Sequence, residues 1–225
     1  MRINYKGFMR EKIKRDVVTI SPDASFFEAR RLIHEKGIRH LPVVDQNNRV
    51  LGIVTDRDIR QAAPSEATTL SVHELNYLLG KLKVSTFMTP RDKLITITPD
   101  TLIEEAVQMM SVHKIGCLPV LEDEKLYGIF TETDALNHLV DIFGLEQKST
   151  RLTVVFEDKP DAMIGVLEAF KRHEVNLISI VSPSFMVEEK RIAAIRIRTG
   201  EYEPIVKDLE KADYAVLSIG KWPSI

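Results

Sequence analysis

The chain has 225 residues, 44% of them hydrophobic, so it can form one large domain or two smaller ones with substantial cores. Its 31 Lys and Arg residues against 33 Asp and Glu give a formal net charge of -2, which excludes the basic field typical of nucleic-acid-binding proteins. No apolar run is long enough to span a membrane, and the first residues lack a signal-peptide core. The single cysteine, Cys117, excludes an internal disulfide, and we expect a cytoplasmic protein without nucleic-acid or membrane partners.

One order of motifs occurs twice, about 77 residues apart. The first copy contains Thr19-Ile20-Ser21-Pro22, then Leu41-Pro42-Val43, then Gly52-Ile53-Val54-Thr55-Asp56-Arg57-Asp58. The second contains Thr96-Ile97-Thr98-Pro99, then Leu118-Pro119-Val120, then Gly128-Ile129-Phe130-Thr131-Glu132-Thr133-Asp134. A fixed period indicates two copies of one supersecondary unit, packed face to face with a cleft between them.

Each repeat is predicted to fold in the order β-α-β-β-α. A β-branched run at 17–20 or 94–97 predicts a first strand, which Pro22 or Pro99 ends because proline supplies no N–H to a sheet. A helix follows, with a capping signature at Ser25-x-x-Glu28 and at Thr101-x-x-Glu104. Two strands come next in each repeat, at 41–44 and 50–55, and at 118–121 and 126–131. A second helix begins at each Thr-x-x-Asp.

The rest of the chain predicts a connector and a different C-terminal unit. Residues 62–66 are typical of a loop, and residues 72–82 predict a helix whose leucines face a core. The elements expected after Gly144 are a strand at 152–156, a helix at 162–173, strands at 176–182 and 191–198, a helix at 202–211 and a strand at 215–219. This βαββαβ order is ferredoxin-like. We predict an α+β protein with a first repeat at 1–61, a connecting loop and helix at 62–83, a second repeat at 84–144 and a C-terminal domain at 150–221.

Two interpretations fit the repeated Thr-x-x-Asp. The threonine hydroxyl and the N–H groups of a helix start can donate to a phosphate or ribose oxygen, while an aspartate accepts hydrogen bonds from both ribose hydroxyls. The same spacing is also that of a helix capping box, its commoner meaning, and duplication would copy a cap as readily as a site. The spacing alone does not choose between them.

Taken together, the motifs of both repeats resemble those of CBS domains: an apolar-T-apolar-x-P segment, then L-P-V, then G-apolar-apolar-T-x-x-D. The resemblance covers residues 8 to about 140. It implies that adenosine-containing ligands such as AMP, ADP, ATP or S-adenosylmethionine bind in the clefts between the repeats. It places Thr19, Pro42, Thr55 and Asp58 beside one cleft and Thr96, Pro119, Thr131 and Asp134 beside the other.

The two predicted sites differ in charge. Arg39 and His40 precede the L-P-V motif of the first copy, where the second copy has Gly116 and Cys117. An arginine suits a phosphate group, and Arg57 is a second candidate. His40 is either a ligand contact or an exposed residue at a strand end. Cys117 is interpreted as a small apolar residue.

The C-terminal unit resembles an ACT domain, through Glu157-Asp158-Lys159-Pro160-Asp161 and Val175-Asn176-Leu177-Ile178-Ser179-Ile180. Asp161 stands where ACT domains that bind amino acids usually have glycine, and its charge opposes a ligand carboxylate. We therefore expect an assembly or coupling module. A CBS pair followed by an ACT domain is similar in arrangement to acetoin-utilization proteins.

The sequence contains no pattern typical of an enzyme. Its histidines and its cysteine lack the spacing of a zinc site, and it has neither a phosphate-binding P-loop nor a nucleophile elbow. We predict a regulatory protein without catalytic residues, metal or cofactor that senses an adenine nucleotide or a related adenosyl ligand, in acetoin or acetate metabolism. The alternative is a structural or scaffolding protein with empty clefts. A homodimer is expected, because amphipathic helices and sheet edges need cover, and the downstream protein partner is unknown.

Overall fold

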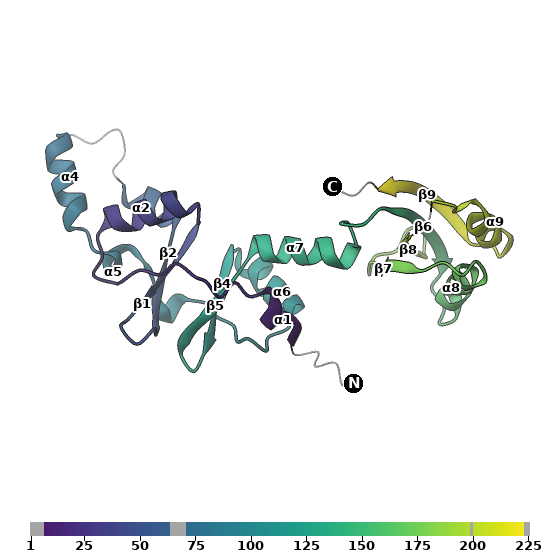
Figure 1. Ribbon diagram of the computed structural model, residues 1–225, viewed down its shortest axis with the longest axis horizontal. Helices are drawn as coiled ribbons and strands as arrows, with labels where there is room; N and C mark the ends of the chain where they lie inside the picture. Colours follow the sequence, from purple (N-terminus) through teal and green to yellow (C-terminus); the bar gives the residue numbers. More distant parts are fainter. Residues whose placement is uncertain (1–6, 64–70, 199, 223–225) are drawn as a thin grey trace. The chain divides into compact units, whose positions relative to one another are not determined.

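The computed structural model describes residues 7–63, 71–198 and 200–222, so most of the loop predicted at 62–66 lies outside the described residues. The chain divides into two units between Ala135 and Leu136 (Figure 1). The first unit contains both hairpins of the repeats, and the second contains a four-stranded sheet. The domain boundaries expected at 61, 83, 144 and 150 stay predictions.

Each repeat contains a helix, a β-hairpin and a second helix, as predicted. The first repeat consists of α2 (Phe26–Lys36), β1 (His40–Val44), β2 (Val50–Thr55) and α3 (Asp56–Ala62). The second consists of α6 (Ile103–His113), β4 (Cys117–Glu122), β5 (Lys125–Thr131) and α7 (Glu132–Phe143). Both hairpins are antiparallel, and each has a register shift at the same motif position, after Val43 and after Val120. The duplicated sequence therefore folds as a duplicated structure.

The strands predicted at 17–20 and 94–97 are wrong. Only Ile20 and Ile97 pair with a hairpin, each through one isolated parallel bridge, to Val43 and Val120. The residues just before them take another course, because Val17 and Leu94 pack between the two hairpins. Each run therefore packs between the hairpins through its first residue and pairs with a strand only through its last residue.

The two helix starts also differ. Ser25 caps α2 as predicted, since the Glu28 N–H donates to its Oγ at 3.2 Å. Thr101 does not cap α6, which begins at Ile103. The Thr101 hydroxyl instead accepts a hydrogen bond from the Thr98 N–H at 3.0 Å, within the turn that follows the bridge. The Thr101 side chain therefore stabilises the turn at residues 98–101 and not the first turn of α6.

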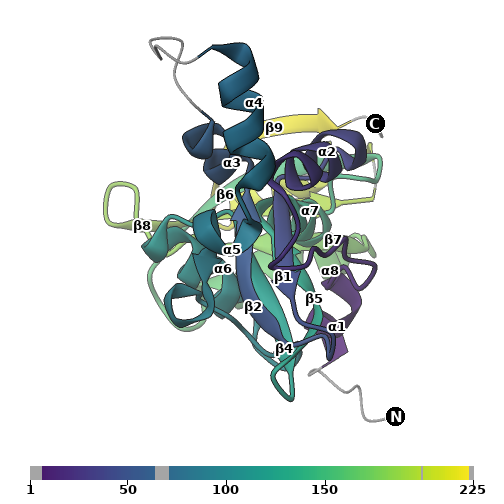
Figure 2. The same ribbon diagram turned by 90° about the vertical axis from the view of Figure 1, so that its left-hand side faces the viewer.

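The hairpins of the two repeats lie side by side (Figure 2). Their tips are joined by a hydrogen bond of 2.9 Å from the Leu126 N–H to the Asn48 carbonyl. Ile53, Cys117 and Ile129 form a buried cluster between the two hairpins. This cluster is separate from two larger cores, each of which is built mainly from one repeat.

The segments that precede the repeats cross over. β3 (Thr89–Pro90) leads into the second repeat but pairs with β2 of the first, and Lys14 leads into the first repeat but bridges to Ile129 in β5. The cores are exchanged in the same way. Met9, in α1 (Gly7–Lys12), is buried in the core of the second repeat, while Val84, in α5 (Val84–Phe87), is buried in that of the first. Each repeat thus completes the other.

The connecting helix predicted at 72–82 is α4 (Val72–Lys81), which extends away from the hairpins of its unit (Figures 1 and 2). Leu79 and Leu82 pack against the core of the first repeat, whereas Leu78 is 53% exposed. The prediction that its leucines face a core therefore holds for one side of the helix. After α5 and β3, the short helix η1 (Arg91–Lys93) leads to the second repeat.

The second unit has the βαββαβ order predicted from the sequence. Its elements are β6 (Ser149–Glu157), α8 (Ala162–Arg172), β7 (Leu177–Val181), β8 (Lys190–Ile197), α9 (Glu203–Lys211) and β9 (Ala215–Trp222). The antiparallel strands lie in the order β7-β8-β6-β9, and α8 and α9 pack against one face through Phe170 and Leu209 (Figure 1). This sheet is compatible with an ACT domain, whose presence stays a prediction.

We predict that the crossing segments make any side chain destabilising at two glycine positions. A Cβ on Gly128 would lie 2.7 Å from the Lys14 carbonyl oxygen, and one on Gly52 would lie 2.6 Å from that of Thr89. Gly128→Ala and Gly52→Ala should each lower the free energy of unfolding of the first unit by about 1–3 kcal/mol, measured by urea denaturation.

Gly80→Ala in α4 is the matched control, because its nearest neighbour would be a Phe27 carbon at an ordinary 3.8 Å. This change should leave stability unchanged or raise it slightly, since alanine favours a helix. Equal effects at all three glycines would contradict the crossing.

Candidate functional site

Two clefts in the first unit combine residues of both repeats. Cleft A has a volume of about 460 Å³ and cleft B of about 300 Å³. Cleft A is lined by Arg39, His40, Ile53, Thr55, Asp56, Arg57, Asp58, Arg60, Thr89, Lys93, Leu94, Ile95, Lys114, Ile115, Gly116, Cys117, Pro119 and Glu132. Cleft B is lined by Lys14, Asp16, Val17, Val18, Gly37, Ile38, Arg39, His40, Ile129, Thr131, Thr133 and Asp134.

The crossing of the chain explains how each cleft is built. Cleft A joins the Thr55-x-x-Asp58 of the first repeat to residues 93–95 and 114–117 of the second. Cleft B reverses the roles, joining the Thr131-x-x-Asp134 of the second repeat to residues 14–18 and 37–40 of the first. The two clefts are therefore equivalent by duplication, and neither belongs to a single repeat.

The structure groups the predicted site residues differently from the sequence. Thr55, Asp58 and Pro119 line cleft A, whereas Thr131 and Asp134 line cleft B. Arg39 and His40 line both clefts. Thr19, Pro42 and Thr96 line neither of the two clefts. The Pro42 carbonyl accepts the Ile20 N–H at 3.0 Å, so this proline helps to hold the bridge. The ligand contacts of all ten residues stay predictions.

Both aspartates form capping boxes. Asp58 Oδ2 accepts hydrogen bonds from the Thr55 N–H at 2.8 Å and from its hydroxyl at 2.7 Å, and the Asp58 N–H donates to Thr55 Oγ1 at 3.2 Å. Asp134 and Thr131 repeat the pattern at 2.8, 2.6 and 3.4 Å. The capping interpretation is thus confirmed. The ribose-binding interpretation is compatible with it, because only Oδ2 of each carboxylate accepts these capping bonds and both aspartates line a cleft.

Arg39 and His40 are shared by the two clefts, because both residues line each of them. His40 is half-buried, and its pKa lies below the ordinary value of 6.5 because burial and the neighbouring Arg39 disfavour its charged form, against the pull of Glu132 and Asp58. Gly116 leaves room for the His40 ring, because a Cβ at residue 116 would lie 3.2 Å from His40 Nε2. His40 therefore begins β1 as a half-buried residue that lines both clefts, and its contact with a ligand stays a prediction.

The inner surface of each cleft is apolar. Ile53 and Cys117 are buried at the back of cleft A, and Ile129 at the back of cleft B. Burial raises the pKa of the Cys117 thiol to about 12, so it remains protonated, in agreement with its interpretation as a small apolar residue. A flat aromatic base would find apolar contacts at these surfaces.

Sequence reasoning missed the residues that enter each cleft from the preceding segment. Lys93 and Ile95 line cleft A, and Asp16 and Val18 line cleft B. The signal was present in the alignment of the two repeats, because residues 16–18 and 93–95 occupy the same position before the first shared motif. The β-branched runs predict strands for residues 17, 18, 94 and 95 and assign no role to Asp16 and Lys93.

The described residues contain neither a metal-binding cluster nor a membrane-spanning helix. Among them, no group of three or more His, Cys, Asp or Glu side chains is placed to hold a metal ion. The helices that the structure describes include none long and apolar enough to cross a membrane.

Comparison with known proteins identifies the repeats. The model of the CBS domain family matches residues 9–65 and 84–141. Inosine-5'-monophosphate dehydrogenase of Korarchaeum cryptofilum is 30% identical over 222 residues, which are 92% of this chain but only 42% of that enzyme. A CBS domain-containing protein of Dictyostelium discoideum is 30% identical over 138 residues, which are 61% of this chain and 94% of that protein.

Two solved structures are similar to the repeat-containing part. One is a Vibrio cholerae protein named as a candidate acetoin utilization protein (AcuB), with a TM-score of 0.51 and 28% identity, covering 61% of this chain and 93% of its own. The other is CBSX2 in complex with AMP, with a TM-score of 0.50 and 26% identity, covering 59% of this chain and 95% of its own.

We predict that His40 makes the first unit less stable in mild acid. Below the ordinary pKa of 6.5 the unfolded chain takes up a proton that the folded protein resists, so stability falls as the pH is lowered through that value. Thermal unfolding at a series of pH values should show a steeper loss for the parent than for His40→Gln, and the two should run parallel above neutrality. Parallel curves over the whole range would contradict the prediction.

Proposed function

We propose that this chain, which belongs to the CBS domain family, is a non-catalytic regulatory protein that binds an adenine nucleotide or a related adenosyl compound in its clefts. The observation that carries the proposal is the pair of equivalent clefts, each with an aspartate at its edge and an apolar inner surface. The AMP complex of CBSX2 supports it by showing the ligand class in a similar structure.

The chemistry of the clefts suits the parts of such a ligand. The adenine ring would lie against Ile53 and Ile115 in cleft A, or against Val18 and Ile129 in cleft B, where burial of apolar surface drives binding. The ribose hydroxyls would donate to the aspartate oxygen that the capping box leaves unused. One oxygen of the carboxylate would then cap the helix, and the other would accept the hydrogen bonds of the ribose.

A ligand panel tests the proposal directly. Titration calorimetry and thermal unfolding with AMP, ADP, ATP and S-adenosylmethionine should give saturable binding of at least one compound and a melting temperature that rises with its concentration as RT ln(1 + [L]/Kd). If none of the four binds, the clefts are empty and the protein is a structural or scaffolding one.

We predict that Asp58→Ala weakens nucleotide binding by about 1.5–3 kcal/mol, because it removes a charged acceptor from the ribose, and that calorimetry will detect the loss. The same change also removes a helix cap, so a lower melting temperature by itself proves nothing. Glu74→Ala is the matched control.

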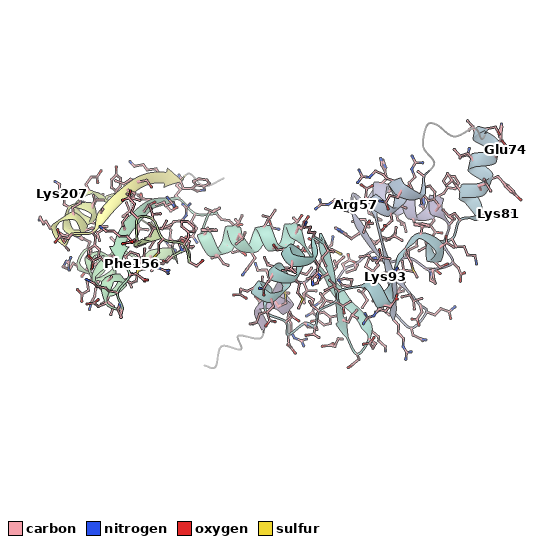
Figure 3. The ribbon with its side chains drawn as sticks, turned by 180° about the vertical axis from the view of Figure 1, so that it is seen from behind. Arg57, Glu74, Lys81, Lys93, Phe156 and Lys207 are labelled. Atoms are coloured by element: carbon pink, nitrogen blue, oxygen red, sulfur yellow. The ribbon has the colours of Figure 1, made fainter. Side chains whose placement is uncertain are left out.

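The control works because Glu74 forms the same kind of cap at α4, accepting from the Ser71 N–H at 2.9 Å, and lines neither cleft (Figure 3). Both variants should melt earlier than the parent, but only Asp58→Ala should lose affinity. If Asp58→Ala bound every nucleotide as tightly as the parent, its role would be capping alone.

A homodimer is part of the proposed function. α7 leaves Leu136, Leu139 and Ile142 exposed at 61%, 44% and 44%, and their spacing puts them on one side of the helix, so α7 offers an apolar surface for a second copy. Light scattering at micromolar protein should return twice the monomer mass. A monomer under these conditions would contradict the proposal.

The C-terminal unit is proposed to be an ACT domain that serves assembly or coupling rather than amino-acid binding. Asp161 lies at the start of α8, and Lys159, the cation best placed to offset its charge, is paired with Glu157. The exposed Leu217 of the edge strand β9 supports an assembly role. The similarity to the Vibrio cholerae protein supports a setting in acetoin or acetate metabolism, with a downstream protein partner still to be identified.

A further inference from the structure

We propose that the two clefts are specialised, so that cleft A binds a nucleoside di- or triphosphate and cleft B binds an adenosyl ligand that carries no phosphate chain. This inference rests on the proposed function and adds which ligand class each cleft takes. It follows from a comparison of the two clefts, position by position, which the internal duplication makes possible.

Three equivalent positions have a cation in cleft A and none in cleft B. At a fourth position, cleft B has Arg39 where cleft A has Gly116, but the Arg39 side chain lines both clefts. Lys93 in cleft A corresponds to Asp16 in cleft B, each at the same distance before the first shared motif. Lys114 corresponds to Gly37, and Arg57 corresponds to Thr133. At each of these three positions cleft A has a cation, where cleft B has an anion or a neutral residue.

The backbone at one of these positions shows that only the side chain has changed. Gly37 and Lys114 both end a helix in the left-handed conformation, with φ values of 60° and 55°. Glycine is the residue that this conformation favours, because it has no Cβ. The helix end is therefore the same in both repeats, and the difference at this position is a lysine side chain in cleft A where cleft B has none.

These three cations have no carboxylate partner in the described part of the chain. Arg60, at the same cleft, is paired with Asp56 at 2.8 Å. By contrast, no carboxylate of residues 7–63, 71–198 or 200–222 lies within the 4.0 Å of an ion pair from Arg57, Lys93 or Lys114. Figure 3 labels Arg57 in α3 and Lys93 in η1. Their charges are available to an anion in the cleft.

The order of groups across cleft A matches the order of groups in a nucleotide. Ile53 is buried at the back, Asp58 is half-buried, and Arg57, Lys93 and Lys114 are exposed at the rim. A base held at the back and a ribose at Asp58 would direct a phosphate chain toward the rim. One phosphate reaches few of these cations, whereas a di- or triphosphate can contact several, and contacts between exposed charges are weakened by salt.

Cleft B has fewer positive charges to bind a phosphate chain. Its two cations, Lys14 and Arg39, are balanced by two carboxylates, Asp16 and Asp134, whereas the five Lys and Arg residues of cleft A outnumber its three carboxylates. Asp16 occupies the position of Lys93, so it would repel a phosphate where cleft A attracts one. The smaller volume of cleft B, about 300 Å³ against about 460 Å³, agrees with a shorter ligand.

The test exchanges the charges between clefts. Calorimetry of the full chain with adenosine, AMP, ADP and ATP should show at least tenfold tighter binding of ATP than of AMP at one site per chain, with the ATP affinity falling as salt is raised. Lys93→Asp should weaken ATP at least tenfold and change adenosine binding less than twofold. Asp16→Lys should create a second ATP site.

Lys207→Asp is the control, because it makes the same charge change in α9 (Figure 3) at a residue that lines neither cleft, and it should leave ATP binding as in the parent. If adenosine binds but ATP is no tighter than AMP, or if Lys93→Asp leaves ATP affinity unchanged, the specialisation is overturned while the proposed function stands. If neither adenosine nor any nucleotide binds, both are overturned.

Discussion

The exchange of segments between the two repeats is the constraint on which the first unit depends. β3 completes the sheet of the first repeat, and Lys14 bridges to the second, so each hairpin is finished by a segment that belongs to its neighbour. Gly52 and Gly128 allow this approach because each lies directly under a crossing backbone. The position of both clefts follows, since each forms where a crossing segment passes the end of the other repeat's second strand.

A single carboxylate in each repeat combines structure with recognition. The capping box at Asp58 fixes the first turn of α3 and at the same time sets the position of the carboxylate at the cleft. A group held by two local hydrogen bonds loses little further freedom when it meets a ligand, which is the advantage of preorganisation. Capping and binding are therefore complementary roles, and Asp134 repeats the arrangement on the other side of the duplication.

The sequence predicted the local structure well and the assembly of the clefts poorly. Helices, hairpins and the apolar nature of Cys117 follow from periodicity and turn residues, which act within a few positions. Duplication made pairing ambiguous: because both repeats carry the same pattern, Thr55 and Asp58 fit the motifs of their own repeat as well as those of the other. Nothing local distinguishes the two pairings. The start of α6 was missed for a different reason, as Thr98 and Thr101 satisfy each other in a turn.

The exchanged cores also determine when the first unit can form during synthesis. The core of the first repeat needs Val84, which emerges from the ribosome after the connecting helix, and the core of the second needs Met9, made near the start of the chain. An N-terminal fragment that ends before residue 84 therefore contains a complete helix–hairpin–helix sequence but an incomplete core. Contacts across so long a stretch of chain close slowly, so the early repeat waits with apolar surface uncovered. The first repeat can therefore close its core only after Val84 has been made, and the second only when its own hairpin meets Met9.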